Sequence, residues 1–471
     1  MSNCGMKRIC ICCAALVGAL VGVGETAAVS VTHSRARLGT IAERKAPNGD
    51  RMLYGLGYCL QVGPTTAAVL VNRNVYSSQV GVWDFEDGVD AFLIDSLEDL
   101  ATAKPIPVIR SGAEPDPDSG GRMRYHNRYP IGGGFVPLGA LVNGKPHPHA
   151  GTGFGVSTTL TYDLAPDGTF RQGRGNVKEY QIFYELKYDG RTFSARPVGK
   201  AFKGNRLRIG STGWEFVAGG LTLAIPDGED LLAAVRARDV KAGPERPWTP
   251  RVGAGSACGI SRWRRADGRW KPVDFTPIAF SDSAHNYYEP SLVRDAKGDL
   301  VFGVRDDGRP WQKVGWELGE QDLNAWKSSD GGKTWRQIVH AEKVRSNSPT
   351  SVGRTADGAI FVAGNFQKGY RRHLALWPVL GDGGALGAPV TVRNAETEFK
   401  PNTSQWLIDH PASAILRLKG GKIVSVLSYR ARDDFWRGNR NCPVTVPSPE
   451  AGCYIETVSS SGKPVPVWEF L

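Results

Sequence analysis

The second half of the chain places acids, histidines, tyrosines and arginines at the ends of short apolar stretches. His285, Tyr288 and Glu289 stand just before a proline that opens one such stretch, and Arg305 and Asp306 end the next one. A carboxylic acid such as Glu289 or Asp306 can protonate a leaving oxygen, and a histidine such as His285 can remove a proton. An arginine such as Arg305 can bind a carboxylate through two parallel hydrogen bonds. These residue types predict proton-transfer chemistry.

A second group of the same kind lies further along the chain. His410 precedes another proline, and Tyr429 and Arg430 end the apolar stretch that follows. Arg430 is a second candidate to bind a substrate carboxylate, and His410 is a candidate to contact substrate. Plainer interpretations exist for both groups. Arg305 and Asp306 can form an ion pair at a strand end, and His410 can be a hydrogen-bonded structural histidine.

Both groups belong to a repeated pattern that predicts the elements around them. Pro290, Pro349 and Pro411 each open an apolar strand, a polar turn with glycine follows, and a second apolar strand comes after it. The period of about 60 residues holds four short strands, which is the content of one propeller blade. If the proline-led strand is the innermost one, residues just before the proline and just after the second strand share one face.

The composition of the whole chain also favours short strands. Its 471 residues include 58 Gly, 30 Pro and 13 Trp, and few segments have helical periodicity. One helix is expected around residues 87–102, and the segments 136–138 and 207–227 look like divergent blades. We expect an all-β fold, a β-propeller with six blades, and five or seven blades are the alternatives.

The most specific motif is the sequence SSDGGKTW at residues 328–335. It resembles the Asp box, or BNR repeat, of sialidases and related propellers. In such a turn the aspartate caps backbone N–H groups, glycine permits a positive φ, and the tryptophan packs between strands. The motif therefore predicts a folding device, and we expect it on the face opposite the candidate site.

The segment 285–295 resembles the blade opening of sialidases, where an Arg-Ile-Pro element supplies an arginine. This chain has Tyr288 and Glu289 at those two positions before the proline. The resemblance covers roughly residues 255–471 and implies a sialidase-like propeller. By analogy with the tyrosine of sialidases, it also implies Tyr429 or Tyr288 as nucleophile, stabiliser or base.

A second resemblance concerns the pair His285-Asn286. Some propeller polysaccharide lyases carry a His-Asn pair ahead of a proline-led strand, and the histidine takes part in proton transfer. The pair here is similar, and it implies that His285 or a tyrosine removes the proton next to a carboxylate that an arginine neutralises.

The N-terminus has the layout of a secretory signal peptide. Lys7 and Arg8 precede an apolar run over residues 9–24, and small residues lead to an expected cut after Ala28. We therefore expect a secreted or periplasmic protein without a membrane span in the mature chain. Residues 29–471 would form a single propeller domain with insert loops in its first half.

Four cysteines remain after that cut. Cys442 and Cys453 flank a proline-rich loop and can close it as a local disulfide, which leaves Cys59 and Cys258 as a long-range pair. Four buried thiols are the alternative. No cysteine or histidine spacing is typical of zinc, so we expect no metal and no cofactor. His126, His147 and His149 lie in an insert loop, where they can bind a metal or sugar or merely belong to the loop.

The formal net charge of +11 favours acidic partners, above all anionic glycans. The basic residues are scattered, which argues against nucleic acid. We expect a carbohydrate-active protein, first an exo-acting glycoside hydrolase of sialidase-like fold on an acidic or derivatised glycan. The alternatives are a polysaccharide lyase that cleaves a uronic acid polymer by β-elimination, and a non-catalytic propeller that binds glycan or protein.

Overall fold

The computed structural model describes most of the chain in separate stretches. The described residues are 29–32, 36–45, 51–76, 86–116, 120–127, 130–164, 177–203, 207–242, 255–282, 284–307, 321–346, 348–366, 371–381, 385–400, 406–433 and 448–462. The expected signal peptide, residues 1–28, and Cys442 lie outside them.

Six antiparallel sheets follow one another along the chain, and we number them as blades 1 to 6. Blade 1 contains β3 (Thr40–Lys45), β4 (Arg51–Gln61), β5 (Ala67–Tyr76), β6 (Glu86–Ile94) and β7 (Ile106–Arg110). Blade 2 contains β8 (Gly112–Pro115), β9 (Met123–Asn127), β10 (Pro130–Val136), β13 (Thr152–Asp163), β14 (Val177–Tyr188) and β15 (Phe193–Lys203). Blade 3 contains β16 (Leu207–Arg208), β17 (Trp214–Gly219), β18 (Ile225–Asp227), β19 (Asp230–Asp239), β20 (Ser256–Ala266) and β21 (Arg269–Phe280).

The second half of the chain forms the other three blades. Blade 4 contains β22 (Tyr287–Arg294), β23 (Leu300–Asp306), β24 (Gln321–Ser328) and β25 (Arg336–Arg345). Blade 5 contains β26 (Ser351–Arg354), β27 (Ile360–Asn365), β28 (His373–Leu380), β29 (Ala385–Leu386) and β30 (Val390–Asn394). Blade 6 contains β31 (Leu407–Arg417), β32 (Ile423–Arg432) and β33 (Gly452–Ser459), and β1 (Ser30–Thr32) and β2 (Arg37–Leu38) pair with β33.

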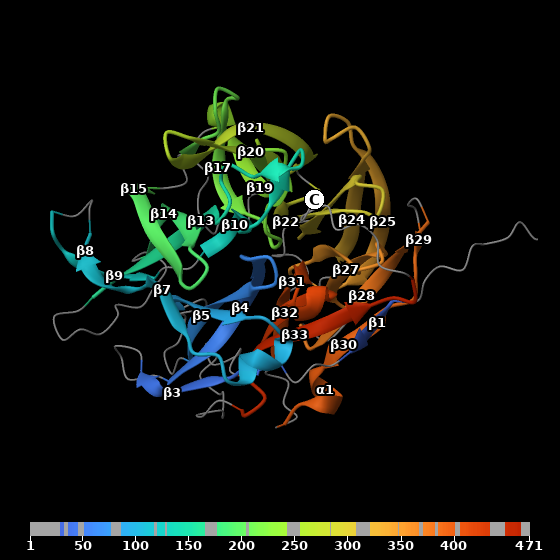
Figure 1. The fold of residues 1–471 in the computed structure, drawn as a ribbon, viewed down its shortest axis with the longest axis horizontal. Helices are drawn as coiled ribbons and strands as arrows, with labels where there is room; N and C mark the ends of the chain where they lie inside the picture. The colour runs from blue at the N-terminus through green and yellow to red at the C-terminus, as the bar shows by residue number, and fades with distance from the viewer. Residues whose placement is uncertain are drawn as a thin grey trace, which may run out of the picture.

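The blades stand side by side in a closed ring (Figure 1). Hydrogen bonds between innermost segments connect each blade to the next around this ring. The bonds join Val62 to Leu138, Gly133 to Ala224, Leu221 to Pro290, Ser291 to Val352, Val352 to Ser413, and Arg417 to Gln61. The last blade completes its sheet with β1 from the start of the chain, so the ring closes by joining the two ends of the sequence. The fold is a six-bladed β-propeller, as the repeat predicted.

The hydrophobic core lies between blades rather than at one centre. In the described residues each of six buried clusters fills the space between two neighbouring blades. The period of 2 along β23 shows how one strand serves two clusters: Leu300, Phe302 and Val304 face blade 3, whereas Val301 faces blade 5. Burial of each such side chain stabilises the fold by about 1.5–3 kcal/mol.

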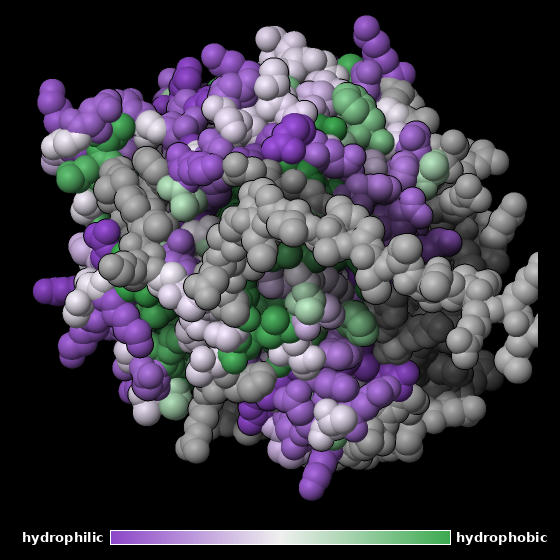
Figure 2. Space-filling model, turned by 90° about the vertical axis from the view of Figure 1, so that its right-hand side faces the viewer, coloured by the Kyte–Doolittle hydropathy of each residue, from purple (hydrophilic) through white to green (hydrophobic). Residues whose placement is uncertain are grey.

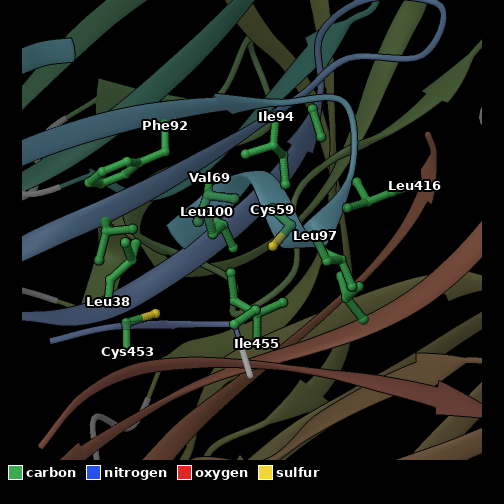
Figure 3. Close-up of a cluster of buried hydrophobic side chains, with 14 of the residues drawn as sticks. Leu38, Cys59, Val69, Phe92, Ile94, Leu97, Leu100, Leu416, Cys453 and Ile455 are labelled. Carbon is green, nitrogen blue, oxygen red and sulfur yellow. The ribbon is translucent and has the colours of Figure 1, made fainter. Parts of the chain in front are cut away.

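The cluster between blades 6 and 1 places two cysteines together (Figure 3). Cys59 on β4 and Cys453 on β33 are both buried in it, and burial raises the pKa of the Cys59 thiol to about 12. Cys258 lies in the cluster between blades 3 and 4. The expected pair of Cys59 with Cys258 is therefore wrong, because the two side chains belong to different inter-blade spaces.

The SSDGGKTW segment forms a capped turn between β24 and β25. Asp330 Oδ1 accepts hydrogen bonds from the backbone N–H groups of Lys333 (3.0 Å) and Thr334 (2.9 Å), and Gly331 has φ 74°. Ser329 Oγ donates to Asp299 Oδ2 (2.9 Å), which places the turn beside the one that joins β22 to β23. We call this end of the ring the Asp-box face.

Short helices occupy only a few turns. They are the 3-10 helices Leu97–Ala101 (η1), Val240–Ala242 (η3) and Lys419–Gly421 (η5) and the α-helix Ala395–Glu398 (α1), and β11 (Leu141–Val142) pairs with β12 (Lys145–Pro146) in a separate hairpin. The helix expected over 87–102 is wrong over most of its length, because Glu86–Ile94 forms the buried strand β6.

Among the described residues, no helix combines the length and apolar character that crossing a bilayer requires. Figure 2 shows hydrophilic residues over much of the described surface on the side of β25 and β29.

Candidate functional site

The candidate residues meet at the end of the ring where the innermost strands begin, opposite the Asp-box face. Tyr288 pairs with Arg305 across β22 and β23, and Asp409 pairs with Arg430 across β31 and β32. This confirms that residues before a proline-led strand share a face with the end of the following strand. We call this end the mouth and define it by Tyr288, Glu289, Arg305, Asp307, Arg371, Asp409, His410 and Arg430.

Three residues of the mouth have a positive φ, which residues other than glycine rarely adopt: Arg371 (54°), Glu289 (49°) and His410 (54°). Glu289 and His410 each directly precede a proline, which disfavours helical conformations in the residue before it. Both lie where the strand register shifts, at equivalent positions of blades 4 and 6. Their side chains meet across the ring, with His410 Nε2 3.6 Å from Glu289 Oε1. Strained positions of this kind cluster at functional sites.

Arg305 joins two carboxyl groups of blade 4. Its Nη1 donates to Glu289 Oε2 (2.8 Å), and its Nε and Nη2 donate to the two carboxyl oxygens of Asp307 (2.8 and 3.3 Å). The guanidinium carbon also lies 4.5 Å from the centre of the Tyr288 ring. Because one guanidinium holds both acids, the bonded oxygens of Glu289 and Asp307 lie within about 8 Å of each other.

The two acids differ in the direction of their pKa shifts. Burial alone would raise the pKa of Glu289, but the charge of Arg305 and the contact with His410 outweigh it and hold that pKa well below its usual range. Burial raises the pKa of Asp307 to about 7, although the charges of Arg345 and Arg371 oppose the shift. Burial therefore disfavours the ionised form of Asp307, whereas the surroundings of Glu289 favour its ionised form.

Asp409 anchors the other half of the mouth. This fully buried carboxylate accepts hydrogen bonds from Arg371 Nη1 (2.7 Å) and from Arg430 Nε and Nη2 (3.0 and 3.2 Å). It also lies 3.0 Å from His410 Nδ1. Burial would lower the pKa of His410, but Asp409 and Glu289 outweigh it and raise that pKa. The imidazolium form of His410 is thus favoured between two carboxylates.

His285 and Asp306 form a separate dyad beside the mouth. His285 Nδ1 lies 2.7 Å from Asp306 Oδ2, and the histidine side chain is 34% exposed. The imidazole stacks on Tyr287 at 5.3 Å between ring centres. Successive residues of a strand point to opposite sides, so Asp306 faces away from the side that Arg305 occupies. Asp306 thus orients His285 and is not one of the two acids on Arg305.

Of the four predicted catalytic residues, only Glu289 belongs to the mouth; His285 and Asp306 lie beside it, and Tyr429 lies away from it. Tyr429 is fully buried between blades 5 and 6, where its ring stacks on Tyr454 at 5.3 Å. Its hydroxyl donates to Glu456 Oε1 (2.9 Å) and accepts from Arg393 Nε (2.8 Å). The next residue along β32, Arg430, points to the opposite side and reaches Asp409. The alternation of side chains along a strand allows only one of these two neighbours to face the mouth.

Two arginines of this region were missed by sequence reasoning. Arg345 ends β25 and is fully buried, and its guanidinium donates to the backbone carbonyls of Asp306, Asp322, Ser346 and Ser348. Arg371 comes from the segment between β27 and β28. Neither residue stands beside a proline-led strand or in any motif, so the sequence offers no signal that would have found them.

The histidines of the blade 2 insert have a structural arrangement. His147 is buried, its Nδ1 accepts a hydrogen bond from the backbone N–H of His149 (3.1 Å), and its Nε2 lies 3.1 Å from the carbonyl oxygen of Gly228. The His126 side chain lies outside the described part of the structure. Within that part, no group of three or more histidine, cysteine, aspartate or glutamate side chains could hold a metal ion.

A cavity follows the ring axis on the Asp-box side. Its lining includes Gln61, Pro137, Val293, Arg354 and Ile415, which lie at or near the far ends of innermost strands. No aspartate or glutamate is among the described residues that line it. The cavity therefore lacks the acids that the mouth brings together.

Comparisons with solved structures give matches of low sequence identity with TM-scores below 0.5. The chain matches no protein-family model, and no curated protein matches it. A protein of unknown function from Dyadobacter fermentans is 12% identical, with 91% of this chain and 96% of that chain covered and a TM-score of 0.49. Trypanosoma rangeli sialidase in complex with sialic acid is 12% identical, with 92% of this chain and 58% of that chain covered and a TM-score of 0.45. Penicillium chrysogenum α-L-arabinanase complexed with arabinobiose is 12% identical, with 92% and 98% covered and a TM-score of 0.44.

The six-bladed propeller seen in the structure agrees with the expectation of a propeller from the Asp-box resemblance. This chain spans 58% of the length of the sialidase chain. The sequence identities and TM-scores are too low to assign an activity from these proteins. A functional assignment therefore has to rest on the residues of the mouth.

Proposed function

We propose that the protein is a glycoside hydrolase that acts at the mouth of the propeller. The observation that supports this most strongly is the pair of acids on Arg305. Glu289 and Asp307 lie close together, and their surroundings shift their pKa values in opposite directions. One ionised and one protonated carboxyl group at this spacing is the equipment that glycoside hydrolysis uses.

The two acids take different roles in this proposal. Asp307 holds a proton near neutral pH and gives it to the leaving oxygen of the glycosidic bond. Glu289 is ionised, and it either attacks the anomeric carbon or activates a water molecule. The bonded oxygens of the two acids lie within about 8 Å of each other, and this upper limit allows both the retaining and the inverting arrangement. His410 and Arg305 hold the Glu289 side chain in place from two sides.

The test is hydrolysis of a panel of neutral, acidic and sialylated glycans by the purified protein. We expect new reducing ends or released monosaccharide, and we expect Glu289→Gln and Asp307→Asn to abolish most of the activity. Asp330→Asn, on the Asp-box face, serves as the matched acid-to-amide control and should keep full activity. Hydrolysis that survives in both mouth variants would place the chemistry elsewhere.

The His285–Asp306 dyad favours a second candidate, a polysaccharide lyase. A partly exposed histidine held by a buried aspartate is suited to remove a proton, and Arg305 lies on the neighbouring strand. Lyase action creates an unsaturated product that absorbs ultraviolet light, whereas hydrolysis does not. The same incubations followed by absorbance therefore separate the two reactions. Glycan binding without any product would favour a non-catalytic binding propeller.

We also propose that the protein is exported. Support comes from the arrangement of Lys7, Arg8, the apolar run and Ala28 in the sequence. N-terminal sequencing of the protein recovered from outside the cytoplasm should begin at Val29. A protein that keeps residues 1–28 and stays with the cytoplasmic fraction would overturn this proposal.

A further inference from the structure

The arginines of the mouth are already bound to carboxylates of the protein itself. Arg305 donates through Nε and Nη2 to both oxygens of Asp307 and through Nη1 to Glu289. Arg430 donates through Nε and Nη2 to both oxygens of Asp409. A fork of two parallel N–H donors is what recognises a substrate carboxylate, and in both arginines that fork is occupied.

The exposed fractions of the side chains at the mouth also argue against binding of an anionic sugar. The Glu289 side chain is 24% exposed, whereas those of Arg305 and Arg430 are 8% and 4% exposed. Arg371, which binds Asp409, is 12% exposed. Among these charged groups the one most open to solvent is therefore a carboxylate with a lowered pKa. This negative charge opposes the approach of an anionic sugar.

Replacement of the internal partners by a substrate carboxylate would be costly. Asp409 is fully buried, and an arginine that turned from it to a ligand would leave that charge less well compensated. Arg345 offers no alternative, because it is fully buried and donates to backbone carbonyls. Arg236 flanks the Tyr288 ring at 5.8 Å, and its Nη2 donates to Ser256 Oγ (3.3 Å).

We propose that the sugar unit bound at the mouth is neutral. This inference rests on the proposed function only for the location of the site. The carboxylate of Glu289 suits sugar hydroxyl groups, because a hydroxyl group can donate a hydrogen bond to it. It differs from the expectation of an anionic glycan that the net charge of +11 raised, because the charge of the whole chain does not describe the charge presented at one site.

The experiment measures binding of free monosaccharides to the wild-type protein by ligand-observed NMR. Galactose, glucose and mannose are compared with their uronic acids and with N-acetylneuraminic acid at fixed ionic strength and pH 7. Free monosaccharides have no glycosidic bond, so binding is read separately from hydrolysis. We expect the best neutral sugar to bind at least tenfold more tightly than any acidic one. Equal or tighter binding of an acidic sugar, or no binding of any neutral sugar, overturns the inference.

The outcomes separate this inference from the hydrolase proposal. Neutral sugars that bind to a protein without hydrolytic activity would support the inference and remove the proposed function. Hydrolysis of acidic glycans together with tight binding of uronic acids would support the proposed function and overturn the inference.

A variant tests the physical reason for the preference. Glu289→Gln removes the exposed negative charge and frees part of Arg305, so the affinity for uronic acids should rise at least fivefold relative to that for neutral sugars. Asp330→Asn removes one negative charge on the other face and should leave the ratio unchanged. Thermal unfolding establishes that both variants are folded. An unchanged ratio in folded Glu289→Gln would show that charge at the mouth does not select the sugar.

Discussion

The two faces of the propeller use the same residue types in different ways. On the Asp-box face, Asp330 accepts hydrogen bonds from its own turn, and Lys327 joins Asp295 and Asp299 of the same blade. At the mouth, Glu289 of blade 4 meets His410 of blade 6, and Arg371 of blade 5 reaches Asp409 of blade 6. In these examples the polar groups of the Asp-box face satisfy turns of a single blade, whereas the charged groups of the mouth come from three blades.

Exposure to solvent also gives the acids of the two faces different pKa values. Asp330 is exposed, and hydrogen bonds from Thr334, Ser328 and Lys333 hold its pKa below the usual range. Asp307 is buried, and burial raises its pKa to about 7. A carboxyl group that caps a turn in water stays ionised, whereas burial that opposing charges do not outweigh favours the protonated form. Convergence across blades together with burial therefore separates a candidate site from a folding device.

Loss of the acids at the mouth should have the largest effect. In Glu289→Gln and Asp307→Asn, kcat/KM on the best substrate should fall by about 10²–10⁴-fold, because each variant removes one of the two proton-transfer groups. Asp330→Asn should stay within about twofold of wild type, since it alters only a distant turn. Steady-state kinetics on all three proteins checks this. Equal losses of kcat/KM in all three variants would contradict the assignment of catalysis to the mouth.

Loss of Asp409 should destabilise the fold strongly. In Asp409→Asn the buried cations Arg371, Arg430 and His410 lose their shared counter-charge, which should cost about 3–5 kcal/mol in the free energy of unfolding. Arg196→Ala removes an ion pair whose arginine is 74% exposed and should cost about 1 kcal/mol or less. Urea denaturation measures both values. Similar losses in the free energy of unfolding of the two variants would contradict the view that burial makes the Asp409 contacts more important.

The activity should depend on pH through Asp307. Its folded-state pKa of about 7 means that the proton needed for the leaving group is lost as pH rises through 7. We expect kcat/KM to fall about tenfold per pH unit above that value, because kcat/KM follows the ionisation of the free enzyme. Glu289 has a lowered pKa and stays ionised well into the acid range, so it should not limit activity near neutrality. A kcat/KM profile that stays flat from pH 6 to pH 9 would remove Asp307 as the acid.

The fold should lose stability in acid through Glu289 and Asp409. Both have folded-state pKa values below their usual range, so the folded state binds fewer protons than the unfolded chain as these groups titrate. Their contribution is present above the unfolded pKa of about 4 and is lost as pH falls below it towards the folded values. Urea midpoints from pH 7 down to pH 3 should show this decline. Asp409→Asn should flatten part of it if the variant remains folded.

The sequence predicted the mouth where the repeat was clear and failed where it was not. Pro290 and Pro411 located the innermost strands of blades 4 and 6, and the shared face of Tyr288, Arg305 and Arg430 followed from strand pairing. Tyr429 illustrates the limit. Its position in the chain was right, but the side of the strand that faces the mouth depends on the register and on the core between blades. Blades 1 to 3 carry longer inserts, so the repeat did not predict their strand limits.

Removal of the Asp-box carboxylate should have the smallest effect. In Asp330→Ala the backbone N–H groups of Lys333 and Thr334 lose their acceptor, but the turn is exposed and water can replace it. The midpoint of thermal unfolding should fall by only a few degrees, and kcat/KM should not change. Calorimetry and kinetics on the same preparation measure both quantities. A large loss of activity with a small loss of stability would mean that the Asp-box face takes part in catalysis, which its local hydrogen bonding argues against.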